Sequence, residues 1–297
     1  MRKCSIVIPT ALLIFSVFLV RPLNAQRSVP DDNLAYPVLV QFPNELASGL
    51  YLNTGAEMYL VTAKHVLLDQ NGRVRSGPMV LLSYSKDPKD SGTNILVADM
   101  TKLSEDGEVK LHPTADVAVV HIGDTAENVQ GGTTASKGPP NSGTFHTIPG
   151  VVVRNAAPGG LLSLSIDTIK KYSDVLVANE VLLFGYPTSL GIQGSPQLDP
   201  SRPLLRSGII AGLNPASKSI IIDCPSYPGN SGGPVVEIDR SAFTAKSNVI
   251  GVVSQFVPFE EKSLNYPIPY QNVSISNSGY TIVTPMDYVL ELVNKAK

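Results

Sequence analysis

From residue 228 to residue 236 the chain reads PGNSGGPVV. Ser231 stands among Gly229, Gly232 and Gly233, ahead of an apolar run that predicts a buried strand. Glycines let a backbone turn its N–H groups toward one point, which is what a site for an oxyanion requires. A Gly-rich hairpin without function is the alternative, but a tight turn needs fewer glycines. Ser231 is therefore a candidate nucleophile.

Two earlier segments supply the groups that a serine nucleophile needs. VTAKHV (61–66) places His65 at the end of a predicted strand, and PTADVAVV (113–120) places Asp116 directly ahead of another. Taken alone, each has an ordinary interpretation, as a surface histidine and as an aspartate that caps a turn. Together with Ser231 they supply a nucleophile, a base and a carboxylate that orients the base.

The order of these residues along the chain separates the hydrolase families. The Gly-x-Ser-x-Gly pattern around Ser231 fits the nucleophile elbow of α/β-hydrolases, whose order is Ser, acid, His, but no histidine follows His146. The subtilisin order, Asp, His, Ser, would need Asp31 or Asp32, which lie in a Pro-containing segment near the N-terminus. The order found here, His, Asp, Ser, is that of chymotrypsin.

VTAKHV, ADVAVV and PGNSGGPVV resemble the three catalytic segments of the chymotrypsin/trypsin-like serine peptidase family. The subtype is similar to the protease domain of bacterial HtrA-like enzymes, without a following PDZ-like segment. EVLLFGYP (180–187) and LRSGII (205–210) are weaker matches to the same domain. The resemblance implies that Ser231 attacks the substrate carbonyl, His65 takes and returns its proton, and Asp116 orients His65.

The resemblance also implies how substrate is held. The N–H groups of Gly229 and Ser231 would form the oxyanion hole, and Ser254 and Gln255 would line the primary pocket and pair with the substrate backbone. The stretch expected to shape that pocket is Cys224–Gly229, in which Cys224, Pro225 and Ser226 would bind substrate.

That pocket-forming segment contains no acidic side chain, so a buried Arg or Lys of a substrate would stay unpaired. We expect a small or medium apolar residue before the cleaved bond, unless a register shift brings Asp223 into the pocket. Residue 230 is Asn, where the digestive branch has an Asp that binds a newly freed N-terminus. We therefore expect no zymogen activation by cleavage.

Composition points to an all-β fold. Gly and Pro number 24 each in 297 residues, which favours short elements joined by turns. No helical crossover pattern lies between the predicted strands, so two antiparallel barrels or a sandwich fit. The predicted strands are Tyr36–Phe42, Gly49–Asn53, Met58–Thr62, Met79–Tyr84, Ile95–Leu103, Asp116–Ile122, Gly150–Arg154, Leu162–Ile169, Val181–Gly185, Ser207–Leu213, Ser219–Asp223, Pro234–Ile238, Asn248–Val253 and Thr281–Thr284.

With the resemblance, the prediction becomes two antiparallel six-stranded β-barrels of the chymotrypsin-like kind. The first barrel spans residues 26–172 and carries His65 and Asp116, and the second spans 173–297 and carries Ser231. Apolar residues spaced by three and four near the C-terminus predict an amphipathic terminal helix. Three stretches interrupted by Gly, Pro, Ser or Asn are predicted to be loops: 124–143, Ser189–Arg202 and Phe256–Asn277.

Residues 1–25 are typical of a signal peptide. Arg2 and Lys3 precede the apolar run Cys4–Val20, and Ala25 suits a small-residue cleavage position. An uncleaved membrane anchor is the alternative. Cleavage would leave a secreted or periplasmic protein without a membrane segment, in which Cys224 is the remaining cysteine.

Charge and cysteine content exclude other classes. Lys and Arg number 23 against 25 Asp and Glu, so the chain lacks the excess of positive charge that is typical of nucleic-acid-binding domains. Two cysteines form neither a disulfide-dense scaffold nor a Cys-based metal site, and no cofactor or metal is expected. The sequence thus predicts an exported serine endopeptidase acting on polypeptides. A catalytically silent binding protein of the same fold and an esterase with the same triad remain alternatives.

Overall fold

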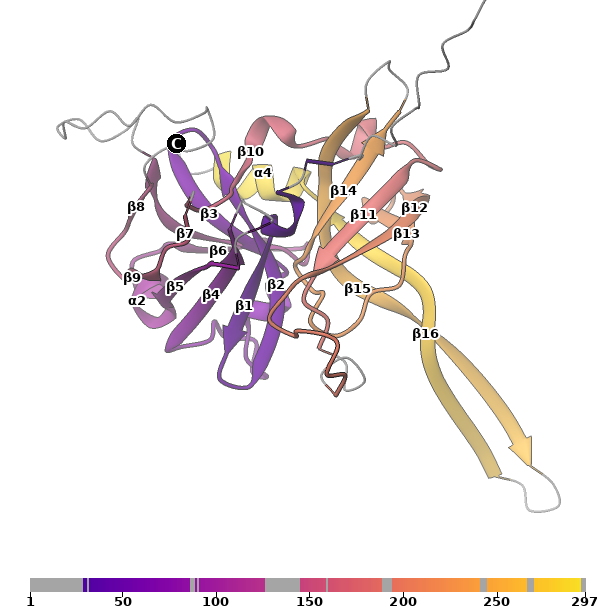
Figure 1. The fold of residues 1–297 in the computed structure, drawn as a ribbon. Helices are drawn as coiled ribbons and strands as arrows, with labels where there is room; N and C mark the ends of the chain where they lie inside the picture. Colours follow the sequence, from indigo (N-terminus) through magenta and orange to yellow (C-terminus); the bar gives the residue numbers. More distant parts are fainter. Residues whose placement is uncertain are drawn as a thin grey trace, which may run out of the picture.

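The computed structural model describes residues 29–30, 32–85, 89, 91–125, 145–158, 160–188, 194–240, 245–265 and 270–294. The predicted signal peptide and nearly all of the 124–143 loop lie outside these residues. The chain forms two β lobes side by side, and a long two-stranded arm leaves the second lobe (Figure 1). Within the described ranges, no helix is long and apolar enough to cross a membrane.

The first lobe is one ten-stranded sheet with the order β6-β7-β3-β2-β1-β4-β5-β9, with β8 added to β7 and β10 to β2. The prediction of a closed six-stranded barrel is corrected here: this path does not close among the described residues. The short strands β6 and β8 were missed because three residues show no clear periodicity. The strands are β1 (Pro37–Phe42), β2 (Glu45–Asn53), β3 (Glu57–Thr62), β4 (Pro78–Tyr84), β5 (Thr93–Asp99), β6 (Val109–Leu111), β7 (Ala118–Thr125), β8 (Phe145–Thr147), β9 (Val151–Asn155) and β10 (Leu164–Ser165).

The second lobe is a closed barrel of six strands, β11-β12-β13-β16-β15-β14, as predicted. Every strand pair in this barrel is antiparallel. Parallel pairing among the described residues is limited to the two-residue contact of β10 with β2 and an isolated bridge between Ile169 and Val249. The strands are β11 (Glu180–Gly185), β12 (Leu204–Asn214), β13 (Ser219–Asp223), β14 (Pro234–Asp239), β15 (Lys246–Asn265) and β16 (Tyr270–Pro285). The all-β antiparallel class is confirmed.

The predicted loop Phe256–Asn277 is wrong. The structure shows that β15 and β16 continue beyond the barrel as a hairpin arm, paired from Pro258↔Asn277 to Asn265↔Tyr270. Prolines in this stretch led to the loop prediction, but an edge strand tolerates a proline because its N–H is not needed for pairing. Val273 and Ile275 alternate with serines, which is the two-residue period of a strand.

Two predicted strands end earlier than expected. Ile95–Leu103 stops being a strand at Asp99, whose carboxylate accepts hydrogen bonds from the N–H groups of Thr101 and Lys102 and caps helix α2 (Met100–Glu105). In Leu162–Ile169 only β10 is extended, and a 3-10 helix, η3 (Ile166–Thr168), follows it. Other short helices are α1 (Lys64–Leu67), η1 (Asn33–Ala35) and η4 (Tyr172–Asp174).

A shared core joins the lobes. Each lobe has its own cluster of buried apolar side chains, and a third cluster includes residues of both lobes, such as Val61, Val119 and Phe184. The terminal helix α4 (Asp287–Asn294) adds Val289 and Val293 to this third cluster, which confirms the predicted helix and its apolar face. Burying this shared surface fixes the two lobes relative to each other, and the site described below lies between them.

Candidate active site

His65 lies on a one-turn helix directly after β3. Ala63 is extended, at φ −68° and ψ 141°, and α1 begins at the next residue. Val66 and Leu67 of this helix are buried in the first-lobe core, which anchors the turn. The imidazole of His65 therefore stays near the surface, where it lines a cleft.

Asp116 holds both the backbone and the ring of His65. Its Oδ1 accepts a hydrogen bond from the backbone N–H of His65 at 3.0 Å, and its Oδ2 lies 2.8 Å from His65 Nδ1. The same Oδ2 accepts a hydrogen bond from Ser254 Oγ at 2.7 Å. With Nδ1–H donating to the carboxylate, the neutral ring presents an unprotonated Nε2, the form that a general base needs.

These contacts shift both pKa values. The hydrogen bond to Asp116 raises the pKa of His65 above its usual 6.5, against the opposing effect of burial. Burial alone would raise the pKa of Asp116, but hydrogen bonds from His65 and Ser254 outweigh it and hold the value below 3.8. Asp116 is therefore ionised wherever His65 is neutral, and it can stabilise a positive charge on the ring.

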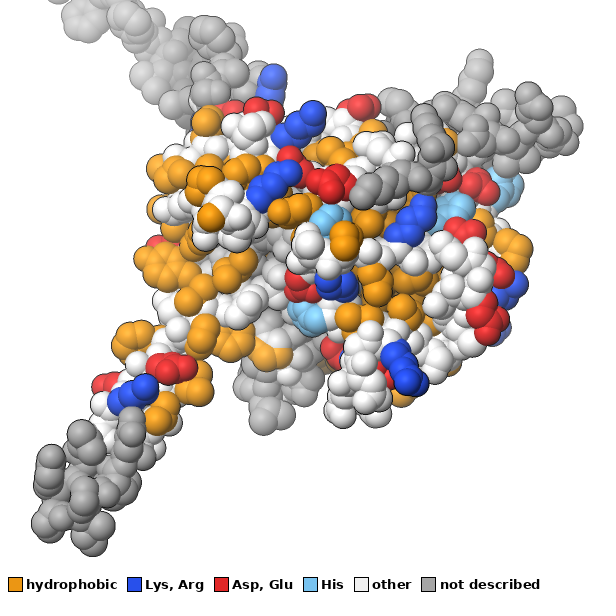
Figure 2. Space-filling model, turned by 180° about the vertical axis from the view of Figure 1, so that it is seen from behind, with side chains coloured by type: hydrophobic (Ala, Val, Ile, Leu, Met, Phe, Trp, Pro, Cys, Tyr) orange, Lys and Arg blue, Asp and Glu red, His pale blue; other side chains and the backbone are white. Residues whose placement is uncertain are grey.

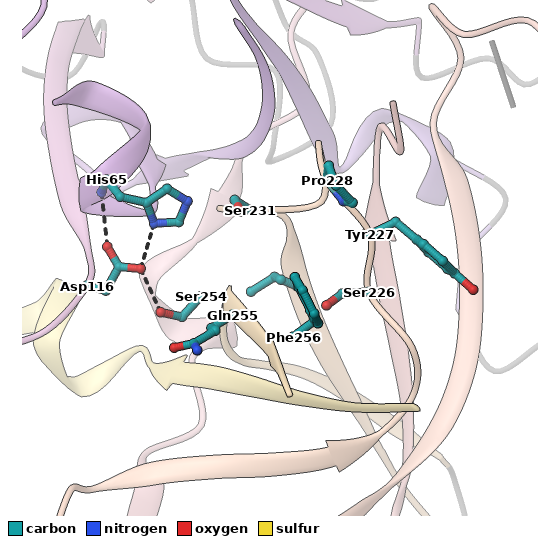
Figure 3. Close-up of a pocket in the computed structure, with 10 residues that line it drawn as sticks. His65, Asp116, Ser226, Tyr227, Pro228, Ser231, Ser254, Gln255 and Phe256 are labelled. Carbon is teal, nitrogen blue, oxygen red and sulfur yellow. Dashed lines mark hydrogen bonds and ion pairs between the residues drawn. The ribbon is translucent and has the colours of Figure 1, made fainter. Parts of the chain in front are cut away.

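Ser231 lies in a turn where backbone conformation and close neighbouring atoms both require glycine. Gly229 and Gly232 have φ values of +92° and +81°, in the left-handed region that favours glycine. A Cβ on Gly232 would overlap the carbonyl oxygen of Ser48 and the hydroxyl of Thr62. In Figure 3 the Ser231 side chain projects into the cleft on the same side as the His65 ring.

The first lobe holds this turn through Ser48 of β2. The backbone N–H of Ser48 donates to the carbonyl of Ser231 at 2.9 Å. Its buried hydroxyl donates to the carbonyl of Gly229 at 2.7 Å and accepts from the N–H of Tyr186 at 2.9 Å. Among the described residues, the N–H groups of Gly229 and Ser231 have no acceptor. They are thus available to a ligand oxygen.

The cleft that contains these groups has a volume of about 410 Å³. His65, Asp116 and Ser231 all line it, so the structure brings the three predicted residues to one place. No hydrogen bond joins Ser231 to His65 among the contacts described here. Within the described ranges, no cluster of three His, Cys, Asp or Glu residues could hold a metal ion.

A family model for the trypsin-like peptidase domain matches residues 47–244, which include all three residues. The chain belongs to the trypsin-like peptidase family. No relative was found among curated proteins by sequence.

Solved structures of similar fold align with most of this chain. The protease Anisep from Arthrobacter nicotinovorans is 14% identical over 88% of this chain and 93% of its own, with a TM-score of 0.46. An HtrA-type protease, AlgW, in complex with a decapeptide is 15% identical over 90% of this chain and 66% of its own, with a TM-score of 0.45. The human heparin binding protein is 10% identical over 91% of this chain and 94% of its own, with a TM-score of 0.50. At this identity the match is a similarity of fold alone.

Three of the five residues predicted to bind substrate line the cleft of this trypsin-like chain: Ser226, Ser254 and Gln255. Cys224 does not, because it is fully buried in the second-lobe core, where burial raises the pKa of its thiol to about 11. Pro225 is also absent from the lining. The prediction for Cys224 is therefore wrong: after Ile220 and Ile222 it continues the inward face of β13.

The stretch Cys224–Gly229, expected to shape the pocket, also supplies Tyr227 and Pro228 to the cleft lining. Val253 and Phe256 complete the lining and were missed from the sequence. The bond from Ser254 to Asp116 had no signal, because it joins residues 138 positions apart.

Proposed function

We propose that this trypsin-like chain is an exported serine endopeptidase that hydrolyses peptide bonds in polypeptides through an acyl-enzyme. One arrangement carries the proposal: Asp116 Oδ2 lies 2.8 Å from His65 Nδ1, and Ser231 lines the same cleft (Figure 3). Serine becomes a useful nucleophile when a neutral imidazole takes its proton, and the imidazole needs a carboxylate to fix its tautomer.

Acylation uses all three residues. Ser231 Oγ attacks the substrate carbonyl carbon while its proton passes to His65 Nε2, and Asp116 stabilises the imidazolium. The negative oxygen of the tetrahedral intermediate accepts hydrogen bonds from the N–H groups of Gly229 and Ser231. Each such donor contributes about 2.7–4 kcal/mol to lowering the barrier. His65 then gives its proton to the leaving amine, and the C–N bond breaks.

Deacylation repeats the sequence with water. His65 takes a proton from a water molecule, the hydroxide attacks the acyl carbon, and the ester bond to Ser231 breaks with return of the proton to Oγ. The product acid leaves and the free enzyme is restored. Because the cycle uses only these side chains and water, it needs no cofactor.

A silent binding protein is the second candidate, and one observation favours it. Ser231 and His65 are not hydrogen-bonded in the described site, and a fold shared with a heparin binding protein does not imply catalysis. Catalytic hydrogen bonds often tighten only when substrate binds, so this observation does not remove the first candidate.

Hydrolysis of a matched pair of substrates tests the proposal. Wild type and Ser231→Ala are each given an unfolded polypeptide and an ester with the same acyl group. An endopeptidase cleaves both, and Ser231→Ala cleaves neither. An esterase cleaves the ester alone. A silent binding protein cleaves nothing, while it remains folded by circular dichroism.

Export is the part of the proposal that rests on residues 1–25. The basic start, the apolar run and Ala25 support it. Expression of the full chain with fractionation of the cells tests it, together with N-terminal sequencing. The expected result is protein outside the cytoplasm that begins near Gln26, and full-length protein in the cytoplasm would contradict it.

A further inference from the structure

The turn that carries Asp116 spans residues 112–117 and joins β6 to β7. A hydrogen bond from the N–H of His112 to the carbonyl of Val117, at 3.0 Å, closes it. From this turn the Asp116 carboxylate accepts the three hydrogen bonds described above. The placement of the turn therefore decides whether the carboxylate reaches its partners.

The imidazole of His112 holds the backbone of this turn. Its Nδ1 accepts hydrogen bonds from the N–H groups of Ala115, at 2.8 Å, and Thr114, at 3.3 Å. Among the described residues these two N–H groups have no other acceptor. Nδ1 must be unprotonated to accept them. Because Ala115 directly precedes Asp116, the ring fixes the backbone next to the carboxylate.

The terminal helix α4 holds the other side of the ring. His112 Nε2 lies 3.3 Å from Glu291 Oε2, and the ring centroid lies 4.7 Å from that of Tyr288, at an interplanar angle of 56°. Histidine side chains elsewhere reach the surface (pale blue in Figure 2), whereas His112 is only 3% exposed. A ring that donates its Nε2–H to Glu291 keeps Nδ1 as an acceptor for the turn.

We propose that His112 is a positioning residue, which sets the place of Asp116 through the two N–H groups of the turn. The inference rests on the proposed peptidase function and adds a residue to its machinery. His112 does not line the cleft, so it acts through Asp116. A further bond joins the same residue to α1: Lys64 Nζ donates to the carbonyl of His112 at 2.9 Å, and Lys64 directly precedes His65.

A purely structural role is the alternative, because a buried ring also contributes packing. The two roles use different parts of the side chain, the Nδ1 acceptor for the turn and the body of the ring for the contact with Tyr288. Asparagine can supply the acceptor without the ring. In this chain Asn214 Oδ1 accepts from the N–H groups two and three residues ahead, Ala216 at 3.1 Å and Ser217 at 3.4 Å, as His112 Nδ1 does. Phenylalanine keeps a ring and has no acceptor.

His112→Asn and His112→Phe therefore separate the two roles. With an ester substrate, His112→Asn should keep kcat within about twofold of wild type, and His112→Phe should lower it at least about tenfold with KM unchanged, because misplacing a catalytic group by about 1 Å can cost about 10²-fold. A more active His112→Phe than His112→Asn would overturn the inference. Equal kcat values in the two variants would also overturn it.

The pH profile gives a readout that packing alone would not move. The hydrogen bond to Asp116 raises the pKa of His65. A displaced carboxylate weakens that bond, so the acid limb of kcat/KM should move to lower pH in His112→Phe and stay in place in His112→Asn. A limb that stays in place in both variants would contradict a displacement of Asp116.

Val289→Ala is the control for a loss of stability. Val289 is buried on α4, in the core that the two lobes share. Its truncation should lower the melting temperature and leave kcat and the acid limb unchanged where the protein is folded. A fall in kcat as large as that of His112→Phe would overturn the inference, because any weakening of α4 would then produce the effect.

Nuclear magnetic resonance tests the positioning without turnover. The ring ¹⁵N shifts of His112 in wild type should show a protonated Nε2 and an unprotonated Nδ1, and a protonated Nδ1 would overturn the inference even if neither variant folds. If wild type hydrolyses neither ester nor peptide, the proposed function fails, and the proton on His65 Nδ1 still reports on Asp116. Its downfield resonance should remain in His112→Asn and be lost in His112→Phe. An unchanged resonance in both would overturn the inference.

Discussion

Ser48 Oγ donates a hydrogen bond to the carbonyl oxygen of Gly229 at 2.7 Å, joining residues 181 positions apart. Ser48 belongs to the first lobe, and Gly229 is one of the two residues whose N–H groups we assign to the oxyanion hole. The contact therefore ties the geometry of the nucleophile turn to a strand of the opposite lobe.

Ser48→Ala should lower kcat while the protein stays folded. The change leaves the carbonyl of Gly229 and the N–H of Tyr186 without a buried partner, which costs about 1–3 kcal/mol of stability. We expect kcat for an ester to fall about tenfold, less than the 10²–10³ measured when an oxyanion donor itself is removed, with KM unchanged.

Ser83→Ala is the matched control, because Ser83 is equally buried but its hydroxyl has no hydrogen-bond partner among the residues that the structure describes. It should change neither kcat nor KM. Equal kcat values in Ser48→Ala and wild type would contradict a role for Ser48 in positioning the turn.

The pH profile of kcat/KM should report the raised pKa of His65. The base must be neutral, so activity is lost as pH falls through that pKa, and the midpoint should lie above pH 6.5. Asp116→Asn removes the largest cause of the shift. Its acid limb should move to lower pH, and the maximal rate should fall about 10⁴-fold.

His121→Gln is a control for this profile, since His121 is hydrogen-bonded to Glu108 and does not line the cleft. Its acid limb should match that of wild type. An acid limb that stays in place in Asp116→Asn would show that His65 is not the titrating base.

Gly232→Ala should destabilise the protein more than Gly72→Ala. Both glycines have positive φ, +81° and +73°, so both alanines carry the strain of the left-handed region, about 1–2 kcal/mol. A Cβ at residue 232 also overlaps Ser48 and Thr62, whereas a Cβ at residue 72 would meet no atom of the described residues within 4 Å, its chain neighbours aside. Urea unfolding should show a larger free-energy loss at 232 by about 1–3 kcal/mol. Equal losses would mean that the turn can shift away from Ser48.

Substrates with an apolar residue before the cleaved bond should be preferred. Among the described residues that line the cleft, Asp116 is the one carboxylate, and His65 and Ser254 are hydrogen-bonded to it, whereas Asp223 does not line the cleft. An Arg or Lys side chain would therefore be buried unpaired. Cleavage-site mapping on a peptide library should show Ala or Val favoured over Arg by at least about tenfold, or 1.4 kcal/mol. A preference for Arg would contradict this description of the cleft.

The residues proposed for catalysis could be predicted from the sequence because each lies in a contiguous motif beside a strong strand signal. The buried runs after Asp116 and Ser231 locate these side chains at strand ends. Contacts such as Ser48 to Gly229 could not be predicted, since single serines show no pattern until the lobes are packed together.

The fold class was predicted correctly, but local extents were not. Proline content made the arm look like a loop, although Val273 and Ile275 carried a strand period. Asp99 was placed inside a strand because apolar residues continue to Leu103, yet its carboxylate caps a helix. Closure of the first sheet depends on long-range pairing, which local periodicity does not reveal.

Labelling by a fluorophosphonate tests the central claim, that His65 activates Ser231, most directly. The mature protein, Ser231→Ala and His65→Ala are treated in parallel, and the adduct is located by mass spectrometry. We predict labelling of wild type at Ser231 and loss of labelling in both variants. Absence of labelling in folded wild type, or undiminished labelling in His65→Ala, would contradict the claim.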